Sequence, residues 1–262
     1  MIFDTHAHYD DEAFDGDRNQ LLDSLAPAGI MAAANIGASL KSCRQTIELV
    51  NRCPWMYGVL GVHPSESGEL TEEGIEWIYQ AVRDTPKIVA IGEIGLDYYW
   101  EEPDHEIQKK WFLRQLDLAR ELKLPVVIHS RDAAKDTLDM MKGSKAEDMG
   151  GVIHCFSYSL EMAKEYLNMG FYLGIGGVVT FKNARKLKEV VEYMPLDRLV
   201  LETDSPYLAP VPYRGKRNSS LNLPYVVEAV AELKGIAKEE VEAAAWENAL
   251  RLYRISDIQL QS

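Results

Sequence analysis

The sequence predicts an α/β protein folded as a (β/α)8 TIM barrel. Continuous apolar runs recur along the chain, which is typical of a parallel sheet covered by helices. Helical segments separate these runs, and eight strand–helix alternations in roughly 250 residues match the size of such a barrel. No linker, low-complexity tract or repeat interrupts the series, so we expect one domain over residues 1–262. The structural alternative is an open doubly wound sheet, but its usual glycine-rich turn after the first strand is absent.

Local signals mark the elements of the first half. Apolar residues open the chain as a buried strand, and Gly29 is expected to end the first helix. Thr71 is the expected N-cap of the third helix, with acidic residues in its first turn. We expect strands that begin near residue 2 and cover 30–36, 56–62 and 87–91, the last continuing into Gly92 and Glu93. Helices are expected over 18–28, over 40–51 and from residue 71.

The second half continues the alternation. Its longest expected helix covers 103–122, where Phe112, Leu116 and Ala119 recur at helical spacing. Strands are expected at 125–128, 151–153, 171–175 and 198–201. Helices are expected after the fifth strand and at 160–169, 184–193, 224–234 and 238–253.

Composition limits the class of protein. The net charge of −13, from 28 basic and 41 acidic residues, argues against a protein that coats nucleic acid nonspecifically, because such binding needs a broad basic surface. Cys43, Cys53 and Cys155 have no disulfide-framework spacing, which suits a reducing compartment. No signal peptide or membrane-length apolar run is apparent. We therefore expect a soluble cytoplasmic protein without a membrane partner, and we predict no particular oligomeric state.

Histidines and acids follow the predicted strands. His6 and His8 lie two apart on the first strand and so project to the same face, with Asp4 one step deeper. One histidine at a strand end is most often structural. In a barrel, however, the carboxyl ends of all strands face one mouth, so these residues are expected to converge. The converging set is His6, His8, His63, Glu93, His129, His154 and Asp204.

The residue types indicate the chemistry. Imidazole and carboxylate together suit zinc, manganese or another borderline divalent ion, whereas an all-oxygen set would favour magnesium or calcium. Four histidines and two carboxylates exceed the ligands of one tetrahedral ion. We therefore predict two divalent ions (zinc, manganese or magnesium) that share a carboxylate bridge. Two such ions, ~3.5–4 Å apart, can hold a bridging hydroxide and stabilise both oxygens of a hydrolysis.

Seven segments carry a family resemblance. They are Thr5-His6-Ala7-His8, Gly61-Val62-His63-Pro64, Gly92-Glu93-Ile94-Gly95-Leu96-Asp97-Tyr98, His129-Ser130-Arg131-Asp132, His154-Cys155-Phe156, Glu202-Thr203-Asp204-Ser205-Pro206 and Arg214-Gly215-Lys216-Arg217-Asn218. In this order they resemble the TatD family of metal-dependent hydrolases, which belongs to the amidohydrolase-like barrels. The match extends from residue 2 to about residue 254. One departure is Ser219-Ser220, where the family commonly has Glu-Pro, so the local geometry of this loop is not predicted.

The resemblance implies roles for the converging residues. The first ion would be held by His6, His8, Glu93 and Asp204, and the second by Glu93, His129 and His154. Asp204 would also orient the nucleophilic water and accept its proton, which makes Asp204 and Glu93 the expected catalytic residues.

Four further residues are expected to contact or support the substrate. His63 is assigned to a substrate phosphate in preference to a metal ion, and Arg131 and Arg214 follow it as candidate anion contacts. Glu202 shares strand parity with Asp204 and is expected beneath it as a supporting carboxylate, grouped with the substrate-binding residues; a buried structural acid is the equal alternative.

Weaker signals surround the site. Gly174-Ile175-Gly176-Gly177 lacks the residues of a phosphate loop and is expected to let substrate or a loop pass close to strand seven. Tyr98, Tyr99 and Trp100 could stack on bases or pack the cleft wall. Lys182, Arg185 and Lys186 are typical of solvated surface, with substrate binding as the alternative.

The resemblance implies hydrolysis of DNA phosphodiesters by a deoxyribonuclease that acts from single-stranded 3′ ends as a 3′–5′ exonuclease. The alternative enzyme is an amidohydrolase that opens a small cyclic amide or ester. Strand five ends in His129, however, where many binuclear amidohydrolases use a carbamylated lysine bridge. A binding module that retains only the barrel would be expected to have lost a ligand position, and none is missing.

Overall fold

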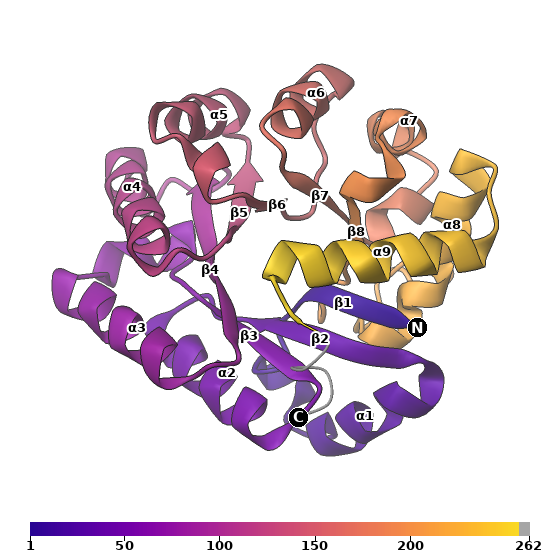
Figure 1. Cartoon of the computed structure of the whole chain (residues 1–262), viewed down its shortest axis with the longest axis horizontal. Coiled ribbons are helices and arrows are strands. Elements are labelled where there is room, and N and C mark those ends of the chain that lie inside the picture. The colour runs from indigo at the N-terminus through magenta and orange to yellow at the C-terminus, as the bar shows by residue number, and fades with distance from the viewer. Residues whose placement is uncertain (257–262) are drawn as a thin grey trace.

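A computed structural model describes residues 1–256; the last part of the predicted domain, residues 257–262, lies outside the described residues. Eight parallel strands form a nearly closed barrel in which each strand is hydrogen-bonded to the next along the chain (Figure 1). The strands are β1 (Ile2–Ala7), β2 (Ile30–Ile36), β3 (Met56–Leu60), β4 (Ile88–Asp97), β5 (Val126–Arg131), β6 (Gly151–Ile153), β7 (Tyr172–Ile175) and β8 (Leu199–Leu201). The predicted (β/α)8 fold is confirmed.

Helices alternate with the strands and surround the barrel (Figure 1). They are α1 (Arg18–Leu25), α2 (Leu40–Arg52), α3 (Glu72–Asp84), α4 (His105–Leu122), α5 (Ala134–Gly143), α6 (Leu160–Asn168), α7 (Arg185–Tyr193), α8 (Leu223–Lys234) and α9 (Lys238–Tyr253). The predicted cap of α3 is present, since the Thr71 side chain accepts a hydrogen bond from the Gly74 N–H. Among residues 1–256, no helix is both long and apolar enough to span a bilayer.

The first and last strands meet through bonds near the carboxyl end of the barrel. The Asp204 N–H donates to the His6 carbonyl at 2.9 Å, and the His8 N–H donates to the Ser205 carbonyl at 2.8 Å. Lower down, the Thr5 hydroxyl donates to the Leu201 carbonyl at 3.0 Å. This closure brings the beginning of the chain against residues about two hundred positions away, and so places His6 and His8 beside Asp204.

The opposite end of the barrel is covered by α9, which crosses in front of β1 and β8 in Figure 1. Its side chains Leu250, Leu252 and Tyr253 join the apolar interior residues of several strands in one buried cluster. Phe3 lies within this cluster and packs its ring near those of Tyr57, Trp246 and Tyr253, at centroid distances of 5.9, 6.0 and 5.9 Å. The amino-terminal end is therefore an apolar core.

Several boundaries differ from the predictions. The helix expected over 18–28 ends at Leu25 and continues as a 3₁₀ turn, Ala26–Ala28, because Pro27 has no N–H for an α-helical bond. The fourth strand was expected over 87–91 but extends to Asp97, and β5 extends to Arg131, because the two strands continue to pair through Asp97 opposite Arg131. Glu93 consequently lies within β4, beside a shift in its register between Ile91 and Ile94, and not after the strand's end.

Candidate metal centre

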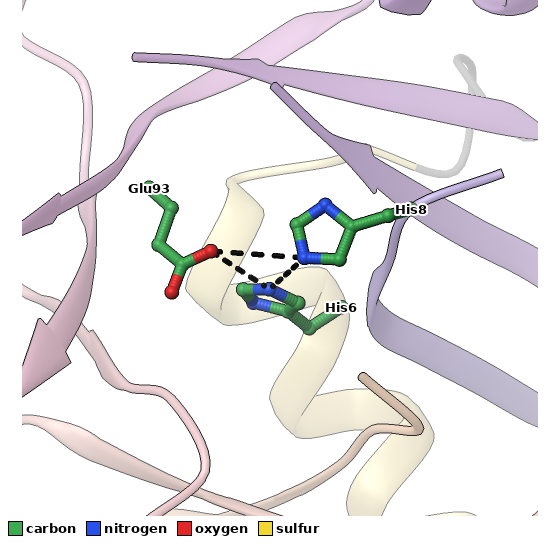
Figure 2. Close-up of side chains that lie close together, drawn as sticks. All are labelled: His6, His8 and Glu93. Atoms are coloured by element: carbon green, nitrogen blue, oxygen red, sulfur yellow. Dashed lines mark hydrogen bonds and ion pairs between the residues drawn. The ribbon is translucent and has the colours of Figure 1, made fainter. Parts of the chain in front are cut away.

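His6 and His8 converge from β1 and its following residue, and Glu93 approaches them from β4 (Figure 2). The two Nε2 atoms are 3.2 Å apart. Oε2 of Glu93 lies 3.4 Å from Nε2 of His6 and 3.7 Å from Nε2 of His8. The Ile36 carbonyl oxygen fixes the orientation of the His8 ring, because it lies 2.8 Å from Nδ1. In the neutral ring Nδ1 therefore carries the proton and donates it to this oxygen, which leaves Nε2 unprotonated. Both Nε2 atoms are thereby directed at one point.

The second oxygen of Glu93 faces a different pair of histidines. Oε1 is 2.7 Å from Nδ1 of His129 and 3.4 Å from Nε2 of His154. The carboxylate is 3% exposed and lies between the two histidine pairs. Each oxygen of the carboxylate therefore faces its own pair of histidines.

Asp204 completes the first group from the end of β8. Its Oδ1 is 3.8 Å from Nε2 of His6, 3.5 Å from Nε2 of His8 and 3.9 Å from Nε2 of His154. Both acids line the cavity at the barrel mouth, but the Asp204 side chain is 18% exposed and that of Glu93 only 4%. Asp204 is therefore the more accessible of the two acids that approach the histidines.

The donor set fits a bound cation. Ligands ~2.0–2.2 Å from a tetrahedral zinc ion lie about 3.3–3.6 Å from one another. The five separations that involve a histidine, within the group of His6, His8, Glu93 and Asp204, are 3.2 to 3.8 Å. Burial alone would lower the pKa of His8, but Asp204 and Glu93 raise it to about 9, so the carboxylates create a potential that favours positive charge. These residues could hold metal ions.

Two more carboxylates support the histidines from outside this group. Oδ2 of Asp97 is 3.2 Å from Nε2 of His129, and Oε1 of Glu202 is 3.2 Å from Nδ1 of His154. Burial would lower the pKa of His154, but Glu202, Glu93 and Asp204 raise it to about 10. No role was predicted for Asp97. Its spacing of four residues from Glu93 becomes informative only once β4 is known to continue to Asp97, opposite Arg131.

Glu202 is buried beside His154. It is 1% exposed and accepts a hydrogen bond from the Cys155 N–H at 2.6 Å. It is not among the residues that line the cavity, so its role toward substrate stays a prediction, with the buried structural acid as the alternative. Gly174, in the glycine-rich segment, leaves room for the Glu202 side chain, because a Cβ on Gly174 would lie 2.1 Å from Oε2 of Glu202.

The same segment also admits a loop, as expected. A Cβ on Gly177 would lie 2.1 Å from the Leu208 carbonyl oxygen, so only glycine lets the chain after β8 pass this close to the chain after β7.

A buried network, not predicted from the sequence, holds the segment that carries Asp204. Asp4 accepts hydrogen bonds from the Thr203 N–H at 3.0 Å, the Thr203 hydroxyl at 2.7 Å and the Ser220 hydroxyl at 2.6 Å. The Ser220 N–H donates to the Tyr9 hydroxyl at 3.0 Å, and the hydroxyls of Tyr9 and Ser220 are 2.6 Å apart. Burial raises the pKa of Asp4 to about 7, although these hydrogen bonds act in the opposite direction. Asp4 therefore supports the loop, and its Oδ1 also accepts a hydrogen bond from the His6 N–H at 3.2 Å.

His63 reaches the cluster from the residues after β3. Its Nδ1 accepts a hydrogen bond from the Ser65 N–H at 3.1 Å, so a neutral ring carries its proton on Nε2. Burial, with His129 nearby, lowers the pKa of His63 to about 3, which keeps the ring neutral. Nε2 lies 3.9 Å from Oε1 of Glu93 and lines the cavity. A protonated Nε2 is a hydrogen-bond donor, which agrees better with a substrate contact than with metal ligation.

The cavity at the mouth has a volume of about 620 Å³. Arg131 lines it, as expected of a substrate contact, whereas Arg214 does not: its guanidinium lies over the Phe181 ring at 4.4 Å. Tyr98 packs against His105 at a centroid distance of 3.8 Å, so this aromatic supports the wall. The metal-binding candidates that line the cavity are His8, Glu93, His129, His154 and Asp204, and His6 lies buried behind them.

A parallel eight-stranded barrel with histidines and carboxylates clustered at one mouth has the architecture of a metal-dependent hydrolase. The model of the family described as "TatD related DNase" matches residues 3–254. The chain belongs to this family.

Individual relatives agree with this membership. The chain is 43% identical over 256 residues to the uncharacterized metal-dependent hydrolase YabD of Bacillus subtilis (strain 168), covering 98% of this chain and 100% of that protein. It is 37% identical over 265 residues to the uncharacterized metal-dependent hydrolase YcfH of Escherichia coli (strain K12), covering 100% and 99%. Among solved structures, the TatD homologue YjjV from Escherichia coli K12 superposes with a TM-score of 0.92 at 30% identity, covering 97% and 98% of the two chains.

Proposed function

We propose that this protein hydrolyses phosphodiester bonds of DNA with two divalent metal ions, acting as a 3′–5′ exonuclease on single-stranded 3′ ends. The observation that carries the proposal is the position of Glu93, whose two oxygens face separate pairs of histidines. The family description, which names a DNase, supports the choice of substrate.

In this proposal Glu93 would contribute to holding both ions. The other residues that would hold them are His6, His8 and Asp204 for the first ion and His129 and His154 for the second. Such ions would supply Lewis-acid stabilisation of the phosphoryl oxygens and make water a nucleophile near neutral pH.

The chain's own residues position the substrate and move the proton. Asp204 faces the cavity, and its carboxylate accepts the proton of the attacking water and returns it to the leaving 3′ oxygen as the P–O3′ bond breaks. Nε2–H of His63 donates to a non-bridging phosphate oxygen, and the guanidinium of Arg131 pairs with the phosphate charge. Burial and the nearby His129 lower the pKa of His63, so this donor is a neutral imidazole.

The cavity favours a short substrate footprint. Its volume of about 620 Å³ is in the range of sites for small ligands, which accommodates a nucleotide at a strand end. Asp10, Asp11 and Glu66 also line it, and their charges oppose the entry of a long polyanion. We therefore expect a small dependence of binding on salt, since few phosphates are neutralised by basic side chains.

The test is a time course on oligonucleotides labelled at the 5′ end, single- and double-stranded, with added Mg²⁺, Mn²⁺ or Zn²⁺. We expect a ladder of products shortened from the 3′ end of the single strand. A product pattern from internal cleavage would exclude the exonuclease mode. Inactivity on every oligonucleotide, together with hydrolysis of a small cyclic amide or ester, would replace the nuclease proposal by the amidohydrolase alternative.

Glu93→Gln tests the bridge itself. The variant keeps the shape of the side chain but removes its charge, so we expect it to bind fewer metal ions. Its activity should fall by more than the roughly 10–100-fold that is typical when an outer-shell partner of a metal ligand is lost. Glu147→Gln, at an exposed acid after α5, is the matched control and should retain full activity. Elemental analysis gives the metal content and circular dichroism the fold. Near-normal turnover of a folded Glu93→Gln at saturating metal would contradict the bridging role.

A further inference from the structure

Two exposed aromatic side chains border the cavity from opposite sides of the barrel. Trp100 lies in the loop after β4 and is 52% exposed, and Tyr207 lies in the loop after β8 and is 55% exposed. Strands β4 and β8 are four positions apart in an eight-stranded order, so the two loops stand across the mouth from each other (Figure 1). Both side chains line the same cavity as Glu93 and Asp204.

Neighbouring residues hold these rings in place. The edge of Trp100 meets Tyr99 at a centroid distance of 4.8 Å and an angle of 89°, and the guanidinium of Arg131 covers Tyr99 at 3.7 Å. The Tyr99 N–H donates to Oδ1 of Asp97, whose other oxygen approaches His129. On the opposite side, the Tyr207 hydroxyl donates to Oδ2 of Asp11 at 3.0 Å. Exposed aromatics anchored in this way remain available to a ligand without packing against each other.

Charge alone does not explain how this cavity would retain DNA. Arg131 is the one lysine or arginine among its lining residues, whereas Asp10, Asp11 and Glu66 are acidic. Stacking of a base on an aromatic ring does not depend on phosphate charge, and it requires a base whose face is not covered by a duplex neighbour. An aromatic border on an acidic cavity therefore suits an unpaired base better than a duplex.

We propose that Trp100 and Tyr207 form a base-binding subsite that stacks on unpaired bases at the 3′ end of a DNA strand and directs the adjacent phosphodiester toward Glu93 and Asp204. The inference rests on the proposed nuclease function and extends it by naming what selects single strands. It makes these two rings binding residues of the substrate, distinct from the residues that carry the chemistry.

The test compares two substrates and two enzymes. The substrates are single-stranded oligonucleotides that end in ordinary nucleotides or in abasic nucleotides at the 3′ end, which retain the phosphates but lack the bases. For wild-type protein, we expect the KM for the abasic end to be roughly tenfold or more above the KM for the ordinary end. For Trp100→Ala, we expect the KM for both ends to be as high as the wild-type KM for the abasic end. Trp100→Phe should restore the preference for the ordinary end. Tyr193→Ala, at a ring that is 52% exposed and does not line the cavity, is the matched control.

Binding is measured separately from cleavage. Tryptophan fluorescence of the metal-reconstituted full chain is followed as oligo(dT) with phosphorothioate 3′ linkages is added, and the same titration is made with Trp100→Ala. Quenching that depends on Trp100 and on the terminal bases supports the subsite even if no oligonucleotide is hydrolysed, in which case only the nuclease proposal fails. Equal KM values of wild-type protein for ordinary and abasic ends, or quenching unchanged in Trp100→Ala, would overturn the subsite.

Discussion

The two ends of the barrel are built from opposite kinds of residue. At the amino-terminal end, Phe3 and Tyr253 belong to a continuous apolar cluster under α9. At the carboxyl-terminal end, Glu93 and His154 are buried just as deeply but are ionisable, at 3% and 5% exposure. Burial of apolar area stabilises the fold, whereas burial of ionisable groups costs free energy unless each finds a partner. The amino-terminal end therefore stabilises the barrel, whereas the carboxyl-terminal end holds buried ionisable side chains together at a cost in stability.

The contrast occurs within single strands. In β1, Phe3 contacts the aromatic cluster, whereas His6, three residues later, contacts Glu93. The Thr5 carbonyl between them accepts a hydrogen bond from the Tyr253 hydroxyl at 2.6 Å, which ties α9 to the strand that supplies both histidines. Changes at the two ends are therefore expected to affect different properties of the same protein.

Phe3→Ala should give the largest change in stability. Removing a ring that is 2% exposed and packs against three aromatic neighbours is expected to lower the free energy of unfolding by ~3–5 kcal/mol. Urea unfolding measures this change, with Met31→Ala, at a residue that is 41% exposed on β2, as the control. Metal content and turnover per folded molecule should stay near those of the wild type. Loss of metal from folded Phe3→Ala would show that the two ends are not separable.

Glu202→Gln should act at the mouth, with a smaller effect. The amide can keep the hydrogen bond from the Cys155 N–H, but it removes the charge beside Nδ1 of His154. Loss of such an outer-shell carboxylate is expected to weaken metal binding roughly 10–100-fold. Competition with a chromogenic chelator measures the affinity, again with Glu147→Gln as control. A wild-type affinity in Glu202→Gln would reduce Glu202 to the buried structural acid that the sequence left open as the alternative.

Local pattern and strand parity were enough to predict the barrel and the convergence of the histidines, because both follow from the order of strands along the chain. The same signals could not predict that Asp97 lies beside His129, since the continuation of β4 to Asp97 depends on its pairing with β5. Nor could they place Glu202, because parity fixes the side of a strand and not which neighbour lies above it. The Asp4 network joins residues that are 199 and 216 positions apart, which no local periodicity reports.

Ser220→Ala tests whether this network supports Asp204, and should give the smallest effect of the three. The substitution removes the 2.6 Å hydrogen bond to Asp4, which keeps its bonds from Thr203, and also the hydroxyl that lies 2.6 Å from that of Tyr9, so ~1–2 kcal/mol of stability should be lost. Because Asp4 holds Thr203 immediately before Asp204, kcat should fall more than KM rises. Ser219→Ala is the matched control, since the Ser219 side chain has no hydrogen-bond partner among residues 1–256.

Thermal unfolding and steady-state kinetics of both serine variants, at saturating metal, separate support of Asp204 from general packing. A role confined to packing would lower the unfolding temperature of Ser220→Ala and leave kcat unchanged. A role in placing Asp204 would lower kcat at a temperature where the variant is fully folded, and Ser220→Thr, which retains the hydroxyl, should recover part of it. Equal kinetics in Ser220→Ala and Ser219→Ala would show that the Asp4 network stabilises the loop without placing Asp204. The position of Asp204 would then depend only on its contacts with the histidines at the barrel mouth.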